Sequence, residues 1–188
     1  HLRPPTHFDF SNNKMPLTVL SWNLNRKSME KIKDINQLAM KQNPDFISLS
    51  EVDLPANNGT VPLHINGYSS ILPKHRTRNL QGMMNVVRLI VLIRNELLNN
   101  VTVRTDLMSE SFPTIWIQTN DDPKINLCFF YRLWKDDNSS RSIEDQQSRL
   151  NILFDQFRYV STTSKHIIAV GDMNIDSNKF NDRTYYLK

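Results

Sequence analysis

Hydrophobic positions recur at helical spacing in two stretches of the chain, and each predicts an amphipathic helix with one buried face. The first helix is expected over residues 28–42, with Ser28 as its N-cap and the Asn-Pro pair at 43–44 as its stop. The second is expected over residues 142–160, with Ser142 as its N-cap. Both helices are expected to cover the faces of sheets.

Strands are predicted where short β-branched or aromatic stretches lie between Asn, Asp and Pro residues. They are expected over residues 17–22, 45–51, 68–72, 88–94, 100–105, 114–119, 125–132 and 166–174. Because the first helix lies between the first two strands, these elements form a crossover unit with neighbouring strands. The even spacing in the middle of the chain favours antiparallel sheet. The pattern as a whole predicts an α/β fold.

The length of 188 residues suits one domain, and the 39% of hydrophobic residues suffice for a real core, which excludes a disordered chain. Residues 1–15 are expected to be a flexible leader, and residues 16–188 the domain. The chain begins with His1 and ends in what resembles an unfinished helix, so we expect a piece of a longer polypeptide. No stretch approaches the roughly 18 apolar residues of a membrane span, and no secretory signal is visible.

The charge balance is mildly basic, with a net charge of +4 and a pI of about 9.2. This excess permits a polyanionic partner without demonstrating one. The clearest basic cluster comprises Lys74, His75, Arg76 and Arg78, which either is a solvated loop or contacts phosphate. The single cysteine, Cys128, lies in an apolar run and is interpreted as a core residue. With no internal disulfide possible, a reducing intracellular compartment is expected.

Polar residues close four of the predicted strands. In chain order they are Asn23 and Asn25, then Glu51, then Tyr131 and Arg132, and finally Gly171, Asp172 and Asn174. If the strand ends meet at one edge, the site holds two carboxylates, several amides, a phenol and a guanidinium. Hard oxygen ligands of this kind suit Mg²⁺ or Mn²⁺. An aspartate can orient or deprotonate an attacking water, and Tyr and Asn can hydrogen-bond a phosphate.

Each of these residues alone also has an ordinary structural explanation. An asparagine after a strand commonly belongs to a turn, and a glutamate that closes a strand commonly lies at the surface. A Gly-Asp pair fits an ordinary turn, and a tyrosine at a strand end is commonly a rim aromatic. Only their joint occurrence favours a catalytic site.

In this order, four segments resemble the motifs of the endonuclease/exonuclease/phosphatase superfamily, which includes deoxyribonuclease I and the apurinic/apyrimidinic endonucleases. They are SWNLN, DFISLSE, FFYR and VGDMN, and the Gly-Asp-x-Asn motif is the most specific. The resemblance covers residues 17–178, and its details look most like the endonuclease domains of non-LTR retrotransposons. It implies a deoxyribonuclease I-like four-layer fold. In that fold a two-layer β-sandwich of mostly antiparallel sheets is flanked by helices, here with the last strands missing.

The resemblance also implies a role for each residue of the site. Glu51 would be the principal ligand of Mg²⁺ or Mn²⁺, and Asn23 would help to shape the metal and phosphate site. Asp172 would orient or activate the attacking water. Asn174 and Tyr131 would hold the scissile phosphate.

Some positions depart from the family's pattern. Asn25 stands where many members carry aspartate, so its metal contact, if any, would be indirect. Trp134 belongs to a Leu-Trp pair where the tyrosine motif usually continues with Pro or Asn; it either stacks on a base or sugar or packs in the protein. Arg132 either contacts a phosphate or pairs at the surface with Asp136 or Asp137.

The Asp-His pair with which the family ends does not occur after Asn174. His166 is interpreted as the first residue of a strand. We expect the missing segment to lie beyond Lys188 and hydrolysis by this chain to be very weak or nil, because an imidazole acid–base contributes about 10²- to 10⁴-fold. Metal binding through Glu51 would survive.

These expectations favour a metal-dependent phosphodiesterase domain that nicks DNA, the target-cleaving endonuclease of a retroelement polyprotein. DNA would be bound mainly through its phosphate backbone, with Lys74, Arg76 and Arg78 in contact, and the protein would be intracellular and nuclear. One alternative is a phosphatase of the same superfamily that acts on phosphoinositides or small phosphate esters. Another is a non-catalytic nucleic-acid-binding remnant. The fold does not distinguish these functions, and the sequence reveals neither the target sequence nor the oligomeric state.

Overall fold

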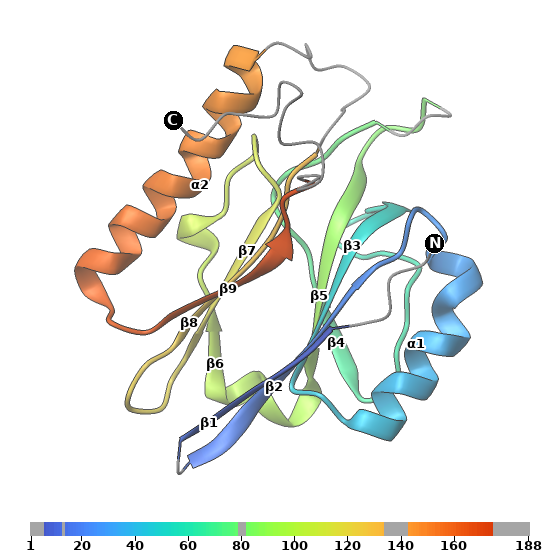
Figure 1. The fold of residues 1–188 in the computed structure, drawn as a ribbon. Helices are drawn as coiled ribbons and strands as arrows, with labels where there is room; N and C mark the ends of the chain where they lie inside the picture. Colours follow the sequence, from blue (N-terminus) through green and yellow to red (C-terminus); the bar gives the residue numbers. More distant parts are fainter. Residues whose placement is uncertain (1–5, 13, 79–81, 134–142, 175–188) are drawn as a thin grey trace, which may run out of the picture.

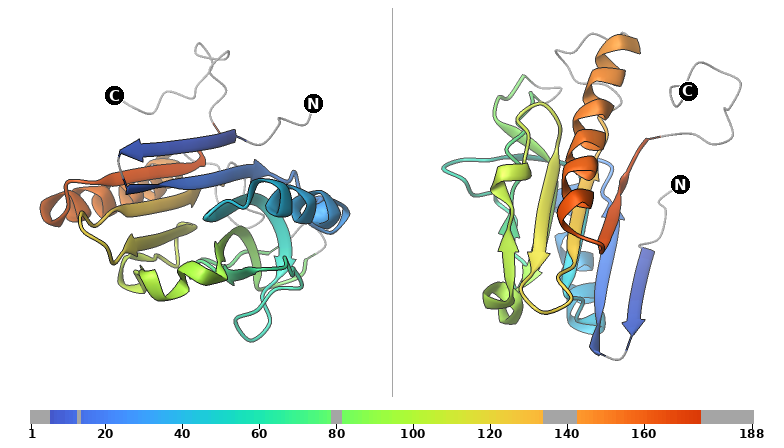
Figure 2. Two further views of the ribbon diagram at one scale, coloured as in Figure 1. Left: turned by 90° about the horizontal axis from the view of Figure 1, so that it is seen from below. Right: turned by 90° about the vertical axis from the view of Figure 1, so that its left-hand side faces the viewer.

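The computed structural model describes residues 6–12, 14–78, 82–133 and 143–174, with side chains from residue 17 onward except at 143–146. The protein has four layers, because two β-sheets pack face to face and one helix covers the outer face of each sheet (Figures 1 and 2). This arrangement confirms the predicted α/β sandwich flanked by helices. Among the described residues, no helix is sufficiently long and apolar to cross a membrane.

The elements follow one another along the chain in the order of their labels in Figure 1. The strands are β1 (Thr6–Asn12), β2 (Lys14–Asn23), β3 (Phe46–Pro55), β4 (Tyr68–Ile71), β5 (Val86–Arg94), β6 (Val101–Val103), β7 (Thr114–Thr119), β8 (Asn126–Tyr131) and β9 (Ile167–Asp172). The helices are α1 (Ser28–Gln42) and α2 (Ile143–Thr163), with short 3-10 helices at Asn95–Asn100 and Thr105–Leu107. One sheet has the order β1-β2-β3-β5-β4 and the other β6-β7-β8-β9.

Two parallel strand pairs position the ends that carry polar residues. Helix α1 connects β2 to β3, and α2 connects β8 to β9; both pairs are parallel, whereas the other five pairs are antiparallel. Parallel neighbours bring their carboxyl ends to the same edge of a sheet. Asn23 therefore lies beside Ser50, and Tyr131 lies beside Asp172. The predicted crossover unit of the first two strands is confirmed.

The space between the sheets is filled by apolar side chains from both. Phe46 of β3 meets Phe129 of β8, with ring centroids 5.9 Å apart. Side chains alternate along β8, so Phe129 and Tyr131 face the other sheet, whereas Cys128 packs toward the layer of α2. Cys128 is fully buried, and burial raises the pKa of its thiol. It is the core residue that the sequence indicated.

Each helix buries its apolar face on its own sheet. Ile35 and Ala39 of α1 pack on the five-stranded sheet. Leu153 of α2 packs beside Trp116 of β7, and the Trp116 indole N–H donates to Gln156 Oε1 at 2.9 Å. This bond satisfies the one polar atom of a fully buried indole.

Two expectations about local structure are wrong. Residues 1–15 are not a flexible leader throughout, because Thr6–Asn12 forms β1 and pairs antiparallel with β2. Ser28 is not the N-cap of α1 but its first residue; Lys27 occupies the cap position without a side-chain capping bond. The predicted cap Ser142 lies outside the described residues.

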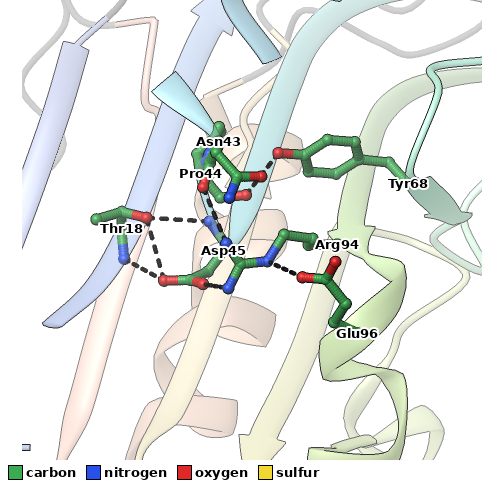
Figure 3. A network of polar contacts seen from close by, with 7 residues as sticks. All are labelled: Thr18, Asn43, Pro44, Asp45, Tyr68, Arg94 and Glu96. Carbon is green, nitrogen blue, oxygen red and sulfur yellow. Dashed lines mark hydrogen bonds and ion pairs between the residues drawn. The ribbon is translucent and has the colours of Figure 1, made fainter. Parts of the chain in front are cut away.

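A polar network joins β2, β3 and β5 near the start of β3 (Figure 3). Asp45 lies at its centre, where its Oδ2 accepts from the backbone N–H of Thr18 at 2.7 Å and its Oδ1 from Arg94 Nη2 at 2.7 Å. Arg94 Nε also pairs with Glu96 at 3.2 Å. Because each partly buried charge has a partner, the network holds the three strands in register without an unpaired charge.

Replacing Tyr68 with phenylalanine is expected to lower the free energy of unfolding by about 1 kcal/mol near neutral pH. The Tyr68 hydroxyl donates to the Pro44 carbonyl oxygen at 2.7 Å, and the variant would leave this carbonyl without its partner. Burial raises the pKa of Tyr68 to about 12 from the ordinary value of 10.0. The unfolded chain therefore loses this proton first, so the phenol's stabilisation is complete below pH 10.0 and is lost as the pH rises toward 12.

Urea unfolding at about pH 8 and about pH 11 measures both effects. The difference between wild type and Tyr68→Phe should shrink at the higher pH. Tyr159→Phe is the control, because Tyr159 is exposed and loss of its hydroxyl should leave stability near neutral pH unchanged. A Tyr68→Phe difference that is equal at both pH values would contradict the raised pKa.

Candidate active site

The ends of β2 and β9 meet across the two sheets. Asn23 Nδ2 donates to Asp172 Oδ2 at 2.8 Å, although the two residues are 149 positions apart in the sequence. β2 belongs to the five-stranded sheet and β9 to the four-stranded sheet, so this bond joins the two layers at their shared edge. The segments SWNLN and VGDMN therefore contribute to one site.

Asp172 is held on both of its carboxylate oxygens. Its Oδ1 accepts from the backbone N–H of Asn174 at 2.8 Å, while its Oδ2 accepts from Asn23. Asn174 has a φ of 49°, and its Nδ2 donates to the Arg132 carbonyl oxygen at 2.6 Å. Such a turn, in which an aspartate side chain bonds the backbone two residues on, is ordinary Asx chemistry. Here the same turn also orients the carboxylate of the site.

Asn25 acts on the site through its backbone. Its N–H donates to Asn23 Oδ1 at 2.9 Å, and its own side chain is exposed. Because this bond engages the Asn23 oxygen, the Asn23 amide nitrogen faces Asp172. The two amides thus differ in role, and a substrate contact by the Asn25 side chain stays a prediction.

Glu51 and Tyr131 belong to facing sheets and interact electrostatically. Tyr131 is buried on the inner face of β8, and Glu51 is half-buried in β3. The pKa of Tyr131 is raised above its ordinary value, mainly by burial and next by the negative charge of Glu51, while a hydrogen bond from Asn174 opposes the shift. Tyr131 therefore stays protonated and is a neutral donor. The expectation that Glu51 ends its strand is wrong, because β3 continues to Pro55.

The oxygen atoms of Asn23, at the end of β2, and of Glu51, in β3, fit one hard cation. Within the described part of the chain, the Glu51 carboxylate accepts no hydrogen bond and forms no ion pair. Over the same residues, no three His, Cys, Asp or Glu side chains form a group that could hold a metal. Few protein ligands are typical of Mg²⁺, which keeps waters and binds substrate phosphate. Glu51 offers a carboxylate, and Asn23 Oδ1 keeps its second lone pair.

Arg132 is enclosed in the protein. Its side chain is 1% exposed, its Nη1 donates to the Met173 carbonyl oxygen at 3.3 Å, and its backbone N–H donates to the Asp172 carbonyl oxygen at 2.9 Å. The prediction of a surface arginine is therefore wrong, and a guanidinium without an exposed face cannot contact a phosphate directly. Arg132 instead supports the turn after β9. The predicted residues Trp134, Asp136 and Asp137 lie outside the described residues.

The predicted basic cluster does not form one exposed surface. Lys74 and Arg78 are exposed, but His75 is buried and Arg76 is half-buried. Arg76 Nη1 donates to the carbonyl oxygens of Pro73 and His75, and burial lowers the pKa of its guanidinium. The loop thus turns Arg76 toward its own backbone. Of this cluster, only Lys74 and Arg78 have exposed side chains.

Sequence reasoning missed Lys31, a residue of α1 that supports the end of β2. Its Nζ donates to the Leu24 carbonyl oxygen at 2.9 Å and lies 5.3 Å from the centroid of the Trp22 ring. Lys31 is buried, and burial lowers its pKa. A lysine in an amphipathic helix gives no local sign of such a position, which depends on how α1 packs. The ion pair of Arg88 and Asp53 was also missed, because it depends on the pairing register of β3 and β5.

Solved structures with a similar fold include two endonucleases and a phosphatase. The endonuclease domain of TRAS1, a telomere-specific non-LTR retrotransposon, is 19% identical with a TM-score of 0.52, and the match covers 93% of this chain and 63% of that chain. The 3′ phosphatase NExo from Neisseria is 14% identical with a TM-score of 0.56, over 84% of this chain and 57% of that chain. The AP endonuclease LMAP from Leishmania major is 14% identical with a TM-score of 0.56, over 84% and 55%. No family model and no curated protein matches the sequence.

The chain spans less than two-thirds of the length of each of these three structures. At such low identities the likeness concerns the fold. All three belong to the superfamily that the four motifs resemble. The chain therefore has the deoxyribonuclease I-like fold of the endonuclease/exonuclease/phosphatase superfamily, as its motifs predicted.

Proposed function

We propose that the chain is a metal-dependent phosphodiesterase domain that nicks DNA. The observation that carries the proposal is the hydrogen bond between Asn23 and Asp172. The Asp172 carboxylate lies close enough to the buried Tyr131 to raise the pKa of its phenol, as does the carboxylate of Glu51. This group combines an oriented carboxylate for a water, a second carboxylate for Mg²⁺ or Mn²⁺, and neutral donors for a phosphate. Both sheets contribute to it, so the site exists only in the folded domain.

Each side chain has a defined part in the proposed reaction. Glu51 would hold the metal ion with Asn23 beside it; when bound, the ion would polarise a phosphoryl oxygen and stabilise the leaving alkoxide. Asp172, fixed on both oxygens, would orient the attacking water and accept its proton. Tyr131 would donate a hydrogen bond to the scissile phosphate, and Asn174 would do so with the Nδ2 proton that now meets the Tyr131 hydroxyl, since its other proton bonds the Arg132 carbonyl oxygen.

DNA is the proposed substrate, bound mainly through its phosphate backbone. The exposed side chains of Lys74 and Arg78 and the net charge of +4 support such contacts. Among the similar structures, the NExo phosphatase is bound to a product DNA hairpin. A target-cleaving role in a retroelement polyprotein draws support from the likeness to the TRAS1 endonuclease domain. A nuclear location is proposed with it, because DNA is the proposed substrate.

Mn²⁺ binding and plasmid nicking together test the proposal. Glu51→Gln is expected to weaken Mn²⁺ binding by at least about tenfold, because hard cations prefer charged oxygen ligands. Binding is measured from the paramagnetic resonance signal of free Mn²⁺ during titration. Nicking is measured as conversion of supercoiled plasmid to open circles in Mg²⁺, with protein in excess so that a slow reaction is still detected.

Glu110→Gln is the matched control, since it removes an exposed carboxylate and should change neither quantity. Equal Mn²⁺ affinity in Glu51→Gln and wild type would refute the proposed metal site. Release of phosphate from inositol lipids without plasmid nicking would favour the phosphatase. Salt-dependent DNA binding without any turnover would favour the non-catalytic remnant.

A further inference from the structure

Strand β3 is irregular at Glu51. Its pairing with β5 shifts between Ser50 and Leu54, so that three residues of β3 lie opposite a single residue of β5, Arg88. Glu51 is the first of the three and has a φ of 51°, which places a residue with a full side chain in the left-handed region. Bulges of this kind redirect a side chain at the edge of a site, and something must hold them.

Arg88 and Asp53 form an ion pair across this bulge. Arg88 Nη1 lies 3.2 Å from Asp53 Oδ1, and their side chains are 3% and 13% exposed. Burying two charges costs several kcal/mol, so an apolar pair of the same size would stabilise the sheet at least as well. The best-attested use of such a pair is to select one register. Here that register places the bulge, and with it Glu51.

The ion pair lies close to the candidate site. The positive charge of Arg88 and the negative charge of Glu51 both act on the pKa of Tyr131, in opposite directions. Arg88 is almost fully buried, which leaves no face of its guanidinium for a phosphate. A direct contact with substrate is therefore not available to it, and any role must pass through a neighbour.

We propose that Arg88, paired with Asp53, is a positioning residue for Glu51: the pair holds the bulge that presents the Glu51 carboxylate to the metal ion. The inference rests on the proposed function, because it needs Glu51 as a metal ligand. Groups that orient a metal ligand without touching the metal commonly change metal affinity by about 10- to 100-fold when removed.

A positioning role of Arg88 and a simple effect of its charge predict opposite changes in Mn²⁺ affinity when Arg88 is removed. If Arg88 acted only as a nearby cation, its removal would strengthen the binding of another cation. If Arg88 orients Glu51, its removal weakens that binding. The direction of the change in Mn²⁺ affinity therefore separates the two roles without any measurement of activity.

The experiment measures Mn²⁺ affinity, again from the resonance signal of free Mn²⁺. Arg88→Met is expected to weaken binding by about tenfold or more, and Arg88→Lys by less because a cation that can pair with Asp53 remains. The double variant Arg88→Met/Asp53→Asn should stay weak although it buries no unpaired charge, which separates lost positioning from a damaged fold.

Arg94→Met is the matched control. Arg94 pairs with Asp45 at 2.7 Å and joins the same two strands at their other end. We expect Arg94→Met to lower the melting temperature while the Mn²⁺ affinity stays at the wild-type value.

Wild-type or tighter Mn²⁺ binding by Arg88→Met would overturn the inference. A comparable loss in Arg94→Met would do so as well, because affinity would then simply follow stability. If Glu51→Gln loses affinity and Arg88→Met does not, the inference alone fails. If Glu51→Gln binds Mn²⁺ like wild type, the proposed function fails and the inference with it.

Discussion

Asp172→Asn is expected to lower plasmid nicking, already expected to be very weak in this chain, below the detection limit of an assay with protein in excess, because a positioned acid–base group contributes about 10²- to 10⁴-fold. The carboxylate accepts from the Asn174 N–H on one oxygen and from Asn23 Nδ2 on the other. An asparagine has one acceptor oxygen, so one of these two donors would face an NH₂ group. Asn23 cannot rotate to compensate, because its oxygen is engaged by the N–H of Asn25.

Mn²⁺ binding should persist in Asp172→Asn, since Glu51 is the proposed ligand, and this separates the water-orienting group from the metal ligand. Asp155→Asn is the control: Asp155 pairs with Arg158 at 2.8 Å on the exposed face of α2, and nicking should be unchanged. Nicking at the wild-type rate by Asp172→Asn would remove this residue from the mechanism.

Gly171→Ala is expected to lower the free energy of unfolding by about 3 kcal/mol, at the upper end of the usual cost of overpacking. A Cβ at this position would overlap the Phe130 carbonyl oxygen and lie 2.7 Å from the Phe130 ring carbon Cγ. Gly171 pairs with Phe130 in the parallel register of β8 and β9. The oxygen therefore cannot move unless the ladder opens, and that ladder also pairs Tyr131 with Asp172.

Thermal unfolding followed by circular dichroism measures this effect, which should lower the melting temperature by about 10 °C in a chain of this size. Gly67→Ala is the comparison, because a Cβ there meets nothing within 4 Å and the cost comes only from a φ of +81°. That cost is about 1–2 kcal/mol. A smaller loss at Gly171 than at Gly67 would contradict the steric argument.

Local patterns predicted the elements well where near neighbours decide the outcome. The bounds expected for the first helix, 28–42, and for the strand at 114–119 are those of α1 and β7. Helical periodicity and β-branched runs act over a few residues, so the sequence shows them directly. The leader was misjudged because β1 exists only through its pairing with β2. A pairing partner is not a local property.

For the candidate site, too, the sequence showed some features, whereas others depend on the tertiary structure. The four motifs named Asn23, Glu51, Tyr131 and Asp172, because strand ends and the residues after them are visible in the order of the chain. The burial of Arg132 was not visible, since the sequence shows a charge but not the turn after β9 that encloses it.

The sequence by itself determined most of the elements, the fold class and the residue types that gather at the strand ends. Only the tertiary structure decided which of them meet: the bond between Asn23 and Asp172 depends on how two sheets stack. It also decided that Glu51 lies in a bulge opposite Arg88, because register is chosen by the pairing of whole strands. Short-range patterns specify elements, whereas contacts between distant residues arise only when the layers pack.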